Sequence, residues 1–425
     1  MAKIAQHEYQ LESFRENNGA PLRIDAYFDK PENDMASFSS PWGYDTLNHL
    51  RAKLFMEAMS LHKSFVGNSG FLRDNLDAFS KLLRGKIPAK QLSAASPALF
   101  QSFMLFVPVI STTFASVGMF LRNVPQKEIA YLFIDEAGQA MPQSAAGAIW
   151  RAQNVIVVGD PLQIEPVVTL HDSIIQSLAD HYRQSDIIKS KYTSVQSLAD
   201  MANRLGGYRT VEEINDLWIG APLTVHNRCQ KKVFDISNKI AYNDKMVFAT
   251  KMHDQAKCQW IHISGESRDG QFVPEQAVAI RGLVLQSFID FADKQDESLK
   301  YPSIFIISPF RSVKAGIAGY FRKNLQSILD ERGVQVSNDI IRKWINACIG
   351  TIHTFQGKEA DTVVVCLGVD SSGKNMGAVD WVCERPNILN VAITRSKENL
   401  YIVGDRSIWG EKPFFKTTMK ICDAE

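Results

Sequence analysis

The chain has two different hydrophobic patterns, which meet near residue 100. Before that point, leucines and methionines recur at helical spacing, as in YDTLNHLRAKLFMEAMSLHKSF and FLRDNLDAFSKLLRGK. Apolar residues three or four positions apart line one face of a helix. We therefore expect residues 1–95 to form a helical region, and this region shows no residues suited to chemistry of its own.

From about residue 100 onward, short apolar runs alternate with amphipathic stretches. The runs are rich in Val and Ile: YLFID, NVIVVGD, QWIHIS, SIFIISP, TVVVCLG and NLYIVGD. Continuous apolar runs predict strands that are buried on both faces. Helical candidates at 276–293 and 311–333 lie between them, and this alternation predicts parallel sheets with helices on both faces. A break near residues 204–222 separates two sets of strands, which predicts two α/β domains at 96–215 and 216–425.

Composition narrows the class of protein without identifying it. The 425 residues are 45% hydrophobic and 22% charged, as in an ordinary soluble protein. A net charge of +1 gives no overall basic excess, although separate basic patches remain possible. The six cysteines form no CxxC pair, which favours reduced thiols in a cytoplasmic protein. The polar amino terminus MAKIAQHEYQLESFRENNG is not typical of a signal peptide.

One stretch, at residues 91–121, carries no charged residue and is long enough to cross a bilayer. Pro108 and the polar cluster Ser111, Thr112 and Thr113 interrupt it. The sequence PVISTT is more typical of a buried strand that runs into a polar loop. We therefore expect no membrane partner.

Two successive predicted strands end in acidic residues. Asp135 and Glu136 follow YLFI, and in a parallel sheet functional side chains gather at the carboxyl ends of strands. Such a pair can hold Mg²⁺ and orient an attacking water, although a lone Asp is often only a helix cap. The next strand ends in GDPLQ, with Asp160 followed by Gln163, an uncharged group able to contact a phosphate and a water. An ordinary Gly-Asp-Pro turn explains one such loop but not two acidic strand ends in succession.

These stretches resemble the motifs of a known family. DEAGQA followed by VVGDPLQIEPVV is similar to motifs II and III of superfamily 1 helicases, in the branch of the nonsense-mediated decay helicase and its DNA-unwinding relatives. LTVHNRCQKKVFDISNKIAYNDKMV resembles motif IV and its helix, and IFIISPFRSVKAGI the next strand and loop. IGTIHTFQGKEADTVVVCLG resembles motif V, and RPNILNVAITRSKENLYIVGD motif VI. The matches keep the family's order over residues 107–405, and an ordered set is far more specific than a single motif.

The resemblance implies a fold and an activity. The fold is α/β, with two recA-like P-loop NTPase-type domains built on parallel sheets, the first of them incomplete, after an N-terminal helical region that resembles an insert of the first motor domain. The activity is the motor core portion of an ATP-dependent helicase. Its cofactors are ATP and Mg²⁺, and its partner is single-stranded DNA or RNA. The family also places a buried strand and a nucleic-acid-binding loop at residues 107–117.

The resemblance assigns catalytic roles residue by residue. Asp135 would hold Mg²⁺, and Glu136 would act on the attacking water. Gln163 would sense the γ-phosphate. Arg228 in HNRC and Arg395 in AITRSK would be arginine fingers that stabilise charge as the phosphoryl group leaves.

Binding roles follow in the same way. In HTFQGKE, Gly357 would let the backbone approach the nucleotide, Lys358 lies beside it, and Glu359 would accept a hydrogen bond from the ribose. Contacts to the nucleic acid backbone suit a motor that grips every sequence equally. The residues assigned to them are Thr112, Thr113, Thr351 and His353. On its own, His353 could equally be a core histidine.

The family's phosphate-binding loop, G-x-x-x-x-G-K-[ST], has no full match in this sequence. GNSGFLRDN lacks the Lys, and in VDSSGKNMG an Asn follows Lys374. Two hypotheses remain. The chain is the carboxyl-terminal portion of a longer or split helicase, inactive alone and partnered by the missing N-terminal part, or it is a hydrolysis-deficient nucleic-acid-binding or partner-binding module derived from a helicase. The acidic pair and both arginines are present in the sequence, which favours the first hypothesis. A phosphatase or Mg²⁺ hydrolase that uses only Asp135 and Glu136 would leave the arginine motifs unexplained.

Overall fold

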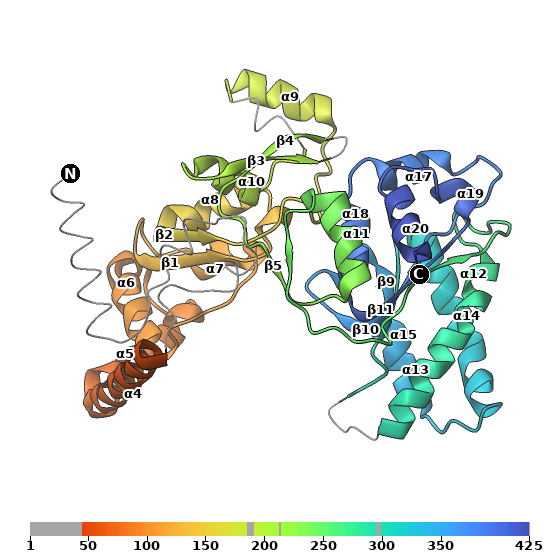
Figure 1. Ribbon diagram of the computed structural model, residues 1–425. Coiled ribbons are helices and arrows are strands. Elements are labelled where there is room, and N and C mark those ends of the chain that lie inside the picture. The colour runs from red at the N-terminus through yellow and green to blue at the C-terminus, as the bar shows by residue number, and fades with distance from the viewer. Residues whose placement is uncertain (1–44, 185–190, 212–213, 295–298, 425) are drawn as a thin grey trace. The chain divides into compact units, whose positions relative to one another are not determined.

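The computed structural model describes residues 45–184, 191–211, 214–294 and 299–424 (Figure 1). Their contacts divide them into two compact units. The first holds the described residues up to Phe133 together with Gln143–Ile156, and the second holds Ile134–Pro142 and the described residues from Val157 onward. The domain limits expected at residues 95 and 215 stay predictions.

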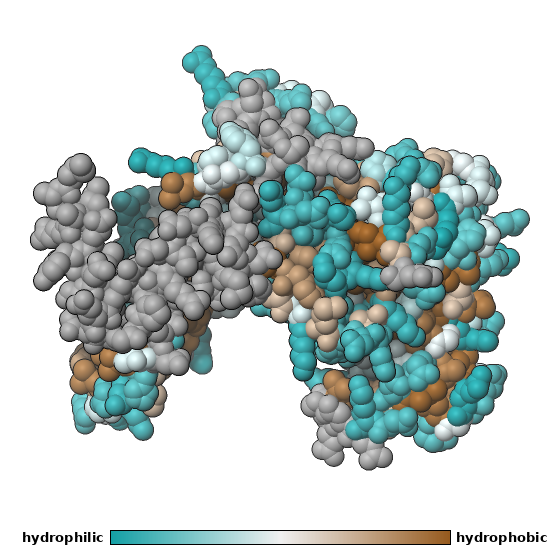
Figure 2. Space-filling view, viewed as in Figure 1, coloured by the Kyte–Doolittle hydropathy of each residue, from teal (hydrophilic) through white to brown (hydrophobic). Residues whose placement is uncertain are grey.

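The first unit begins with helices, as predicted for the part of residues 1–95 that is described. They are α4 (Asp45–Asn68), α5 (Gly70–Leu83), α6 (Ala89–Phe106) and α7 (Phe114–Phe120). Their core includes Phe79 and Phe100, and the Phe79 ring stacks on Phe103 with centroids 4.2 Å apart. Figure 2 shows apolar side chains at the surface of this helical part, where Phe55 and Met56 of α4 are exposed.

The strand expected within residues 107–117 is a wrong prediction. Helix α6 ends at Phe106, residues 107–113 form neither helix nor strand, and Val109 is 83% exposed. Pro108 cannot donate to a strand ladder, and the apolar residues before it belong to the end of α6, where Leu105 and Phe106 are exposed. Within the described part of the chain, no helix is both long and apolar enough to cross a membrane.

Strands β1 (Ile129–Ile134) and β2 (Ala152–Val157) pair as a two-stranded sheet. Between them lie the short helix η1 (Ala137–Gln139) and α8 (Pro142–Arg151). Both strands were predicted, but their burial on both faces was not borne out, because Tyr131 and Phe133 are more than half exposed. An apolar run predicts a strand, but the neighbours that would cover it are a property of the tertiary structure.

The second unit contains a five-stranded sheet with the order β7, β11, β10, β8, β9. Every neighbouring pair in it is parallel. The bounds are β7 (Cys258–His262), β8 (Ile304–Ser308), β9 (Ile349–Thr351), β10 (Ala360–Cys366) and β11 (Ser396–Gly404). Four of these strands were predicted, and β9 is additional. All five residues of β8 are buried, as expected for a parallel sheet covered on both faces. The predicted α/β class is therefore confirmed.

Helices surround this sheet (Figure 1). The helix predicted at 276–293 is two helices, separated at Ile280. The helices are α11 (Lys231–Tyr242), α12 (Pro274–Ala279), α13 (Arg281–Lys294), α14 (Arg311–Asp330), α15 (Asn338–Cys348), α16 (Ile352–Phe355), α17 (Met376–Cys383), α18 (Asn387–Ile393), α19 (Arg406–Trp409) and α20 (Phe415–Asp423).

Smaller elements complete the second unit. Strands β3 (Gly207–Val211) and β4 (Ile214–Ile219) form an antiparallel pair, and β5 (Val225–His226) runs parallel to β6 (Val247–Phe248). The remaining helices are α9 (Asp172–His181) and α10 (Val195–Ala202). All six cysteines are buried free thiols.

Candidate nucleotide-hydrolysis site

The acidic pair lies in a turn directly after β1. Glu136 has φ 53° and ψ 37°, a left-handed conformation that is uncommon for a residue with a side chain. Its backbone N–H donates to Asp135 Oδ1 at 2.9 Å. Glu136 Oε2 accepts hydrogen bonds from Gln356 Nε2 at 2.9 Å and from Gln139 Nε2 at 3.4 Å. An unusual backbone conformation at an acidic residue is a feature that accompanies functional sites.

The loop after α16 lies beside this carboxylate. Gly357 has φ +72°, and a side chain added there would meet Glu136 Oε1 at 3.8 Å. Glu359 Oε2 is 3.1 Å from Arg228 Nε, so the arginine that follows β5 joins the same loop. The Lys358 ammonium lies 5.8 Å from the Phe355 ring. The structure thus brings residues of three separate sequence motifs together.

Arg395 is only 2% exposed, and its donors face protein acceptors. Nε donates to Val391 O at 3.0 Å, and Nη1 donates to Lys358 O at 3.3 Å. Burial lowers the pKa of Arg395, and the charge of Arg228 lowers it further, whereas Glu136 raises it. The two predicted arginine fingers and the predicted catalytic carboxylate therefore share one electrostatic neighbourhood.

A second contact joins the turn that carries Arg228 to the turn that carries Arg395. The Cys229 thiol donates to Thr394 O at 3.7 Å, which links the residue after Arg228 to the residue before Arg395. Burial raises the pKa of Cys229 to about 12, so this thiol stays protonated and acts as a small buried donor.

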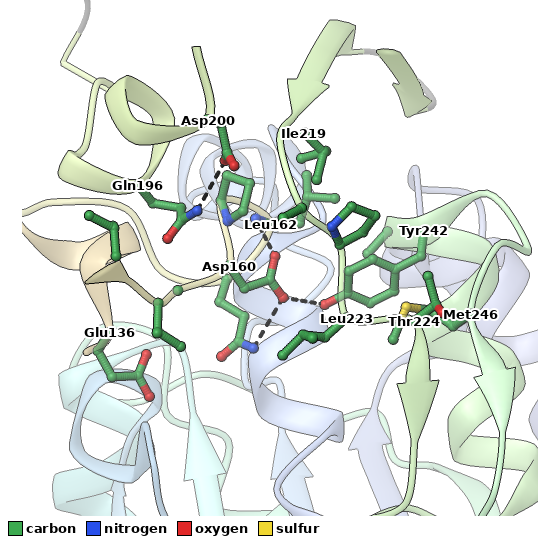
Figure 3. A pocket seen from close by; sticks show the side chains of 18 of the residues that line it. Glu136, Asp160, Leu162, Gln196, Asp200, Ile219, Leu223, Thr224, Tyr242 and Met246 are labelled. Carbon is green, nitrogen blue, oxygen red and sulfur yellow. Dashed lines mark hydrogen bonds between the residues drawn. The ribbon is translucent and has the colours of Figure 1, made fainter. Parts of the chain in front are cut away.

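The loop after β2 is organised around the carboxylate of Asp160 (Figure 3). Asp160 Oδ2 accepts from the Tyr242 hydroxyl at 2.5 Å and from Gln163 Nε2 at 3.1 Å. Asp160 Oδ1 accepts from Leu162 N at 2.9 Å. Burial raises the pKa of Asp160, although these hydrogen bonds oppose the shift. Gln163, the predicted phosphate sensor, is turned toward Asp160 in this conformation.

The segment that leads to Arg395 holds the same loop. Asn387 Nδ2 donates to Pro161 O at 3.1 Å and also to Gln163 O. Asn390 Nδ2 donates to Leu162 O at 3.0 Å. Because Asn387 and Asn390 are three residues apart on α18, both side chains face the loop.

Several residues of this site were not singled out by the sequence. Asp160 was noticed as an acidic strand end but given no role. A weak signal existed for the others, because each lies within a motif-like stretch quoted above. They are Tyr242, Gln356, Asn387 and Asn390.

A cavity of about 500 Å³ opens beside this loop. Its lining includes the predicted residues Asp135, Glu136 and Gln163, of which Glu136 is labelled in Figure 3. Its size is within the usual range for a small-molecule site. Further around the wall are two buried polar side chains, Gln196 and Asp200, which hydrogen-bond each other at 3.2 Å.

The residues predicted to contact nucleic acid lie in both units. Thr351 is half-buried, with Oγ1 3.2 Å from Thr354 Oγ1. The His353 side chain is exposed, which argues against a core histidine. Neighbouring protein atoms still remove part of its hydration, and this loss, with the charge of Arg311, lowers its pKa. The remaining two are exposed in the first unit: Thr112 and Thr113.

One loop of the second unit has most of the phosphate-loop pattern. Gly368, Gly373 and Lys374 fall at the required spacing between β10 and α17, with Asn375 in place of Ser or Thr. Its amides are already used: Gly368 N donates to Gln276 Oε1, Val369 N to Gln271 O, and Ser372 N to Asp370 Oδ1. Hydrogen bonds from two serines also hold the pKa of Asp370 far below its usual range. A carboxylate of the chain therefore fills this loop, and it does not form a phosphate cradle.

The donor set suits a magnesium ion that arrives with a nucleotide. Within the residues that the structure describes, no group of three or more His, Cys, Asp or Glu side chains could hold a metal ion. Asp135 offers an exposed carboxylate with one oxygen engaged by a backbone N–H. Mg²⁺ in nucleotide enzymes typically takes one or two carboxylates, several waters and the phosphates themselves, so these residues fit such an ion.

Comparison with known protein families gives the general class of this protein. Two family models, each described as an AAA domain, match residues 69–170 and 212–407. They place the chain among P-loop NTPases.

Individual relatives narrow this class. The DNA replication ATP-dependent helicase/nuclease DNA2 of Gallus gallus is 22% identical over 300 residues, covering 70% of this chain and 25% of that protein. The regulator of nonsense transcripts 1 of Dictyostelium discoideum is 20% identical over 386 residues, covering 85% of this chain and 25% of that protein. The chain belongs to the superfamily 1 helicases, in the nonsense-decay-helicase-like branch.

The chain spans about a quarter of the length of these relatives. A solved structure, the Arterivirus nonstructural protein 10 helicase, is 14% identical and covers 65% of this chain and 39% of its own, with a TM-score of 0.29. That likeness is too weak to support any inference.

The turn that carries Arg228 should be sensitive to pH. His226 Nε2 accepts a hydrogen bond from Cys229 N at 2.9 Å, and burial, with the charge of Arg228, lowers the pKa of His226 to about 4. Because the unfolded chain binds this proton near pH 6.5, the free energy of unfolding should fall as pH drops from about 6.5 to 4, by up to about 3 kcal/mol.

Chemical denaturation across this pH range measures the effect. His226→Gln keeps an acceptor but does not titrate, so its stability should depend less on pH between 6.5 and 4. Equal slopes for the two proteins would contradict the assignment.

Proposed function

We propose that this chain is the motor core portion of a cytoplasmic ATP-dependent helicase that moves along single-stranded DNA or RNA. The observation that carries the proposal is the convergence on Glu136. Its carboxylate accepts a hydrogen bond from Gln356 and lies beside Gly357, and its charge acts on the pKa of Arg395. A carboxylate whose charge reaches a buried arginine suits phosphoryl transfer to water.

Each residue then has a role in hydrolysis. Asp135 would hold Mg²⁺, which when bound neutralises phosphate charge. Glu136 would orient the attacking water and accept its proton. Gln163 would turn from Asp160 to contact the γ-phosphate. Arg228 and Arg395 would stabilise the charge that develops on the phosphoryl group.

The nucleotide and the nucleic acid would use separate groups. Gly357 lets backbone approach the nucleotide closely because it lacks a side chain, with Lys358 beside it. Glu359, paired here with Arg228, would exchange that partner for the ribose when ATP binds. The groups that would grip the nucleic acid backbone are Thr112, Thr113, Thr351 and His353.

The phosphate-binding loop would come from outside these 425 residues, either from a longer form of the same helicase or from a separate subunit. The loop at residues 368–375 does not replace it, because its amides donate to protein acceptors. We therefore expect the chain alone to hydrolyse ATP poorly or not at all.

The test is ATP turnover, measured with and without single-stranded DNA or RNA. The chain alone should be nearly inactive. The chain joined to its native upstream segment, if that segment carries a GK[ST] loop, should hydrolyse ATP and be stimulated by single strands. Helicase-level turnover by the chain alone, or none in the joined protein, would refute the proposal.

A second candidate is a hydrolysis-deficient nucleic-acid-binding or partner-binding module. It is favoured by the arginine pairing, since Arg228 is bound by Glu359 and Arg395 by backbone carbonyls. Such a module should bind single strands with an affinity that falls steeply with salt. Its binding should not change when ATP is added, even to the joined protein.

A further inference from the structure

Trp381 is a large aromatic side chain that the second unit leaves exposed. Val379 and Val382 are buried and hold α17 in the core, whereas Trp381 on the same helix is 48% exposed. Its ring contacts that of Phe310, with centroids 6.4 Å apart, where β8 leads into α14. A single exposed apolar residue is ordinary on a protein surface, so the surroundings of Trp381 decide what it can do.

Basic side chains lie beside this aromatic pair. Arg311 directly follows Phe310, and Lys314 lies three positions further along α14, so both are on one face of that helix. Both side chains are exposed, and Arg311 makes no ion pair with any residue that the structure describes. The acidic residue before the tryptophan, Asp380, is paired with Lys412 at 2.7 Å, which offsets its negative charge. This surface can therefore accept an anion.

The same edge of the five-stranded sheet carries residues predicted to contact nucleic acid. Ser308 and Thr351 are register partners at the carboxyl ends of the neighbouring strands β8 and β9. Arg311 follows the first strand and His353 follows the second, and the charge of Arg311 lowers the pKa of His353. Side chains that follow neighbouring parallel strands meet at one edge of the sheet. The free arginine thus lies between Trp381 and the predicted backbone contacts.

We propose that Trp381 is a base-stacking residue, on whose ring an unpaired base of a single strand lies while Arg311 and His353 hold neighbouring phosphates. Aromatic rings stack on bases of any sequence, and basic groups that follow the backbone supply the remaining affinity. The bases of a duplex stack on each other and cannot reach the ring. The proposal rests on the proposed function for its partner, and it adds a residue that recognises single strands through a base.

The first experiment uses the full chain and two probes, an oligothymidylate of about 12 nucleotides and a strand of the same length without bases. Trp381→Ala should bind the oligothymidylate about tenfold more weakly, the loss expected for one stacked base. It should bind the strand without bases as tightly as the unchanged chain does. Trp381→Phe keeps a ring and should retain most of the affinity. An equal loss on both strands, or no loss on oligothymidylate, would overturn the proposal.

Trp150→Ala is the matched control for this loss. Trp150 is 50% exposed and belongs to the first unit, so its exposure equals that of Trp381 while its surroundings differ. This variant should bind oligothymidylate as the unchanged chain does. A loss as large as that of Trp381→Ala would show that any exposed tryptophan has this effect, and the proposed site would be refuted.

Tryptophan emission reports the stacked base directly, because a base that stacks on an indole ring quenches its fluorescence. Oligothymidylate should quench part of the emission of the unchanged chain. Trp381→Phe should still bind the strand but lose this quenching, whereas Trp150→Phe should keep it. Quenching that persists in Trp381→Phe would place the stacked base on another tryptophan and contradict the proposal.

Arg311→Ala separates the phosphate contact from the base contact. It should weaken binding to both strands and reduce the slope of log K against log salt by about 0.7, the value for one phosphate of a single strand. Trp381→Ala should leave the slope unchanged. Arg342→Ala is the control, because Arg342 is exposed on α15 and pairs with Asp339. An unchanged slope in Arg311→Ala, or an equal change in Arg342→Ala, would refute the phosphate contact.

These outcomes differ from those that test the proposed function. If binding depends on Trp381 but the joined protein hydrolyses no ATP, the proposed function fails and the stacking site stands. If the joined protein hydrolyses ATP under stimulation by single strands and Trp381→Ala binds them unchanged, the proposed function stands and this proposal fails. A chain that binds no oligothymidylate even at low salt also overturns this proposal, and ATP turnover of the joined protein then decides the proposed function.

Discussion

Glu136→Gln is expected to lower the ATP hydrolysis rate of the joined protein by about 10²–10⁴-fold, the range that general bases contribute. The amide has the same shape as the carboxylate, and its oxygen can still accept the hydrogen bond from Gln356. It cannot accept a proton from water. The affinity for ATP should therefore change little, and the measurement is kcat beside the Kd for ATP.

Glu411→Gln is the matched control for this substitution. Glu411 is an exposed carboxylate that pairs with Lys416 at 2.6 Å, and its loss should leave turnover unchanged. A comparable fall in both variants would indicate a general effect of lost charge. A Glu136→Gln protein that keeps half of its activity would exclude Glu136 as the base.

Arg395→Lys is expected to lower hydrolysis by about 10³-fold, as for the loss of an arginine finger. Lysine keeps the positive charge but not the planar fork that reaches Val391 O, Lys358 O and Thr394 Oγ1 together. Part of this loss of hydrolysis should come from a less stable site, since the buried oxygen atoms that accept from Arg395 are left with fewer donors. We expect a fall of about 1–3 kcal/mol in the free energy of unfolding.

Kinetics and chemical denaturation measured on the same variant separate these effects. Arg342→Lys is the control, because Arg342 is exposed and pairs with Asp339 at 2.9 Å. A loss of stability in Arg395→Lys without a loss of kcat would make Arg395 a structural residue only. Unchanged kcat and stability would contradict both roles.

The sequence predicted the strands better than their surroundings. All six apolar runs are strands, because a short run of Val and Ile specifies a local extended backbone. Burial on both faces held for β8 and failed for β1. Whether a strand is covered depends on elements far away in the chain, and the run itself carries no record of them.

The strand wrongly predicted near Pro108 shows the same contrast between local backbone and distant neighbours. Local pattern predicted an extended segment there, and the segment is indeed neither helical nor paired. A strand exists only when a neighbour supplies its hydrogen bonds, and within the described residues β1 and β2 pair only with each other. The prediction failed on pairing, which is not a local property.

By itself the sequence determined the α/β class, the family and the types of residue at each motif, because strand ends and motif spacing are local features of the chain. The tertiary structure decided which of those residues meet. It bound Glu359 to Arg228 and turned Gln163 toward Asp160. It also filled the loop at 368–375 with its own carboxylate. The partners that hold these groups come from far along the chain: Tyr242 bonds Asp160 from 82 positions away, and Ser267 bonds Asp370 from 103 positions away. Such contacts are set by how the folded elements pack, and a one-dimensional pattern does not contain that information.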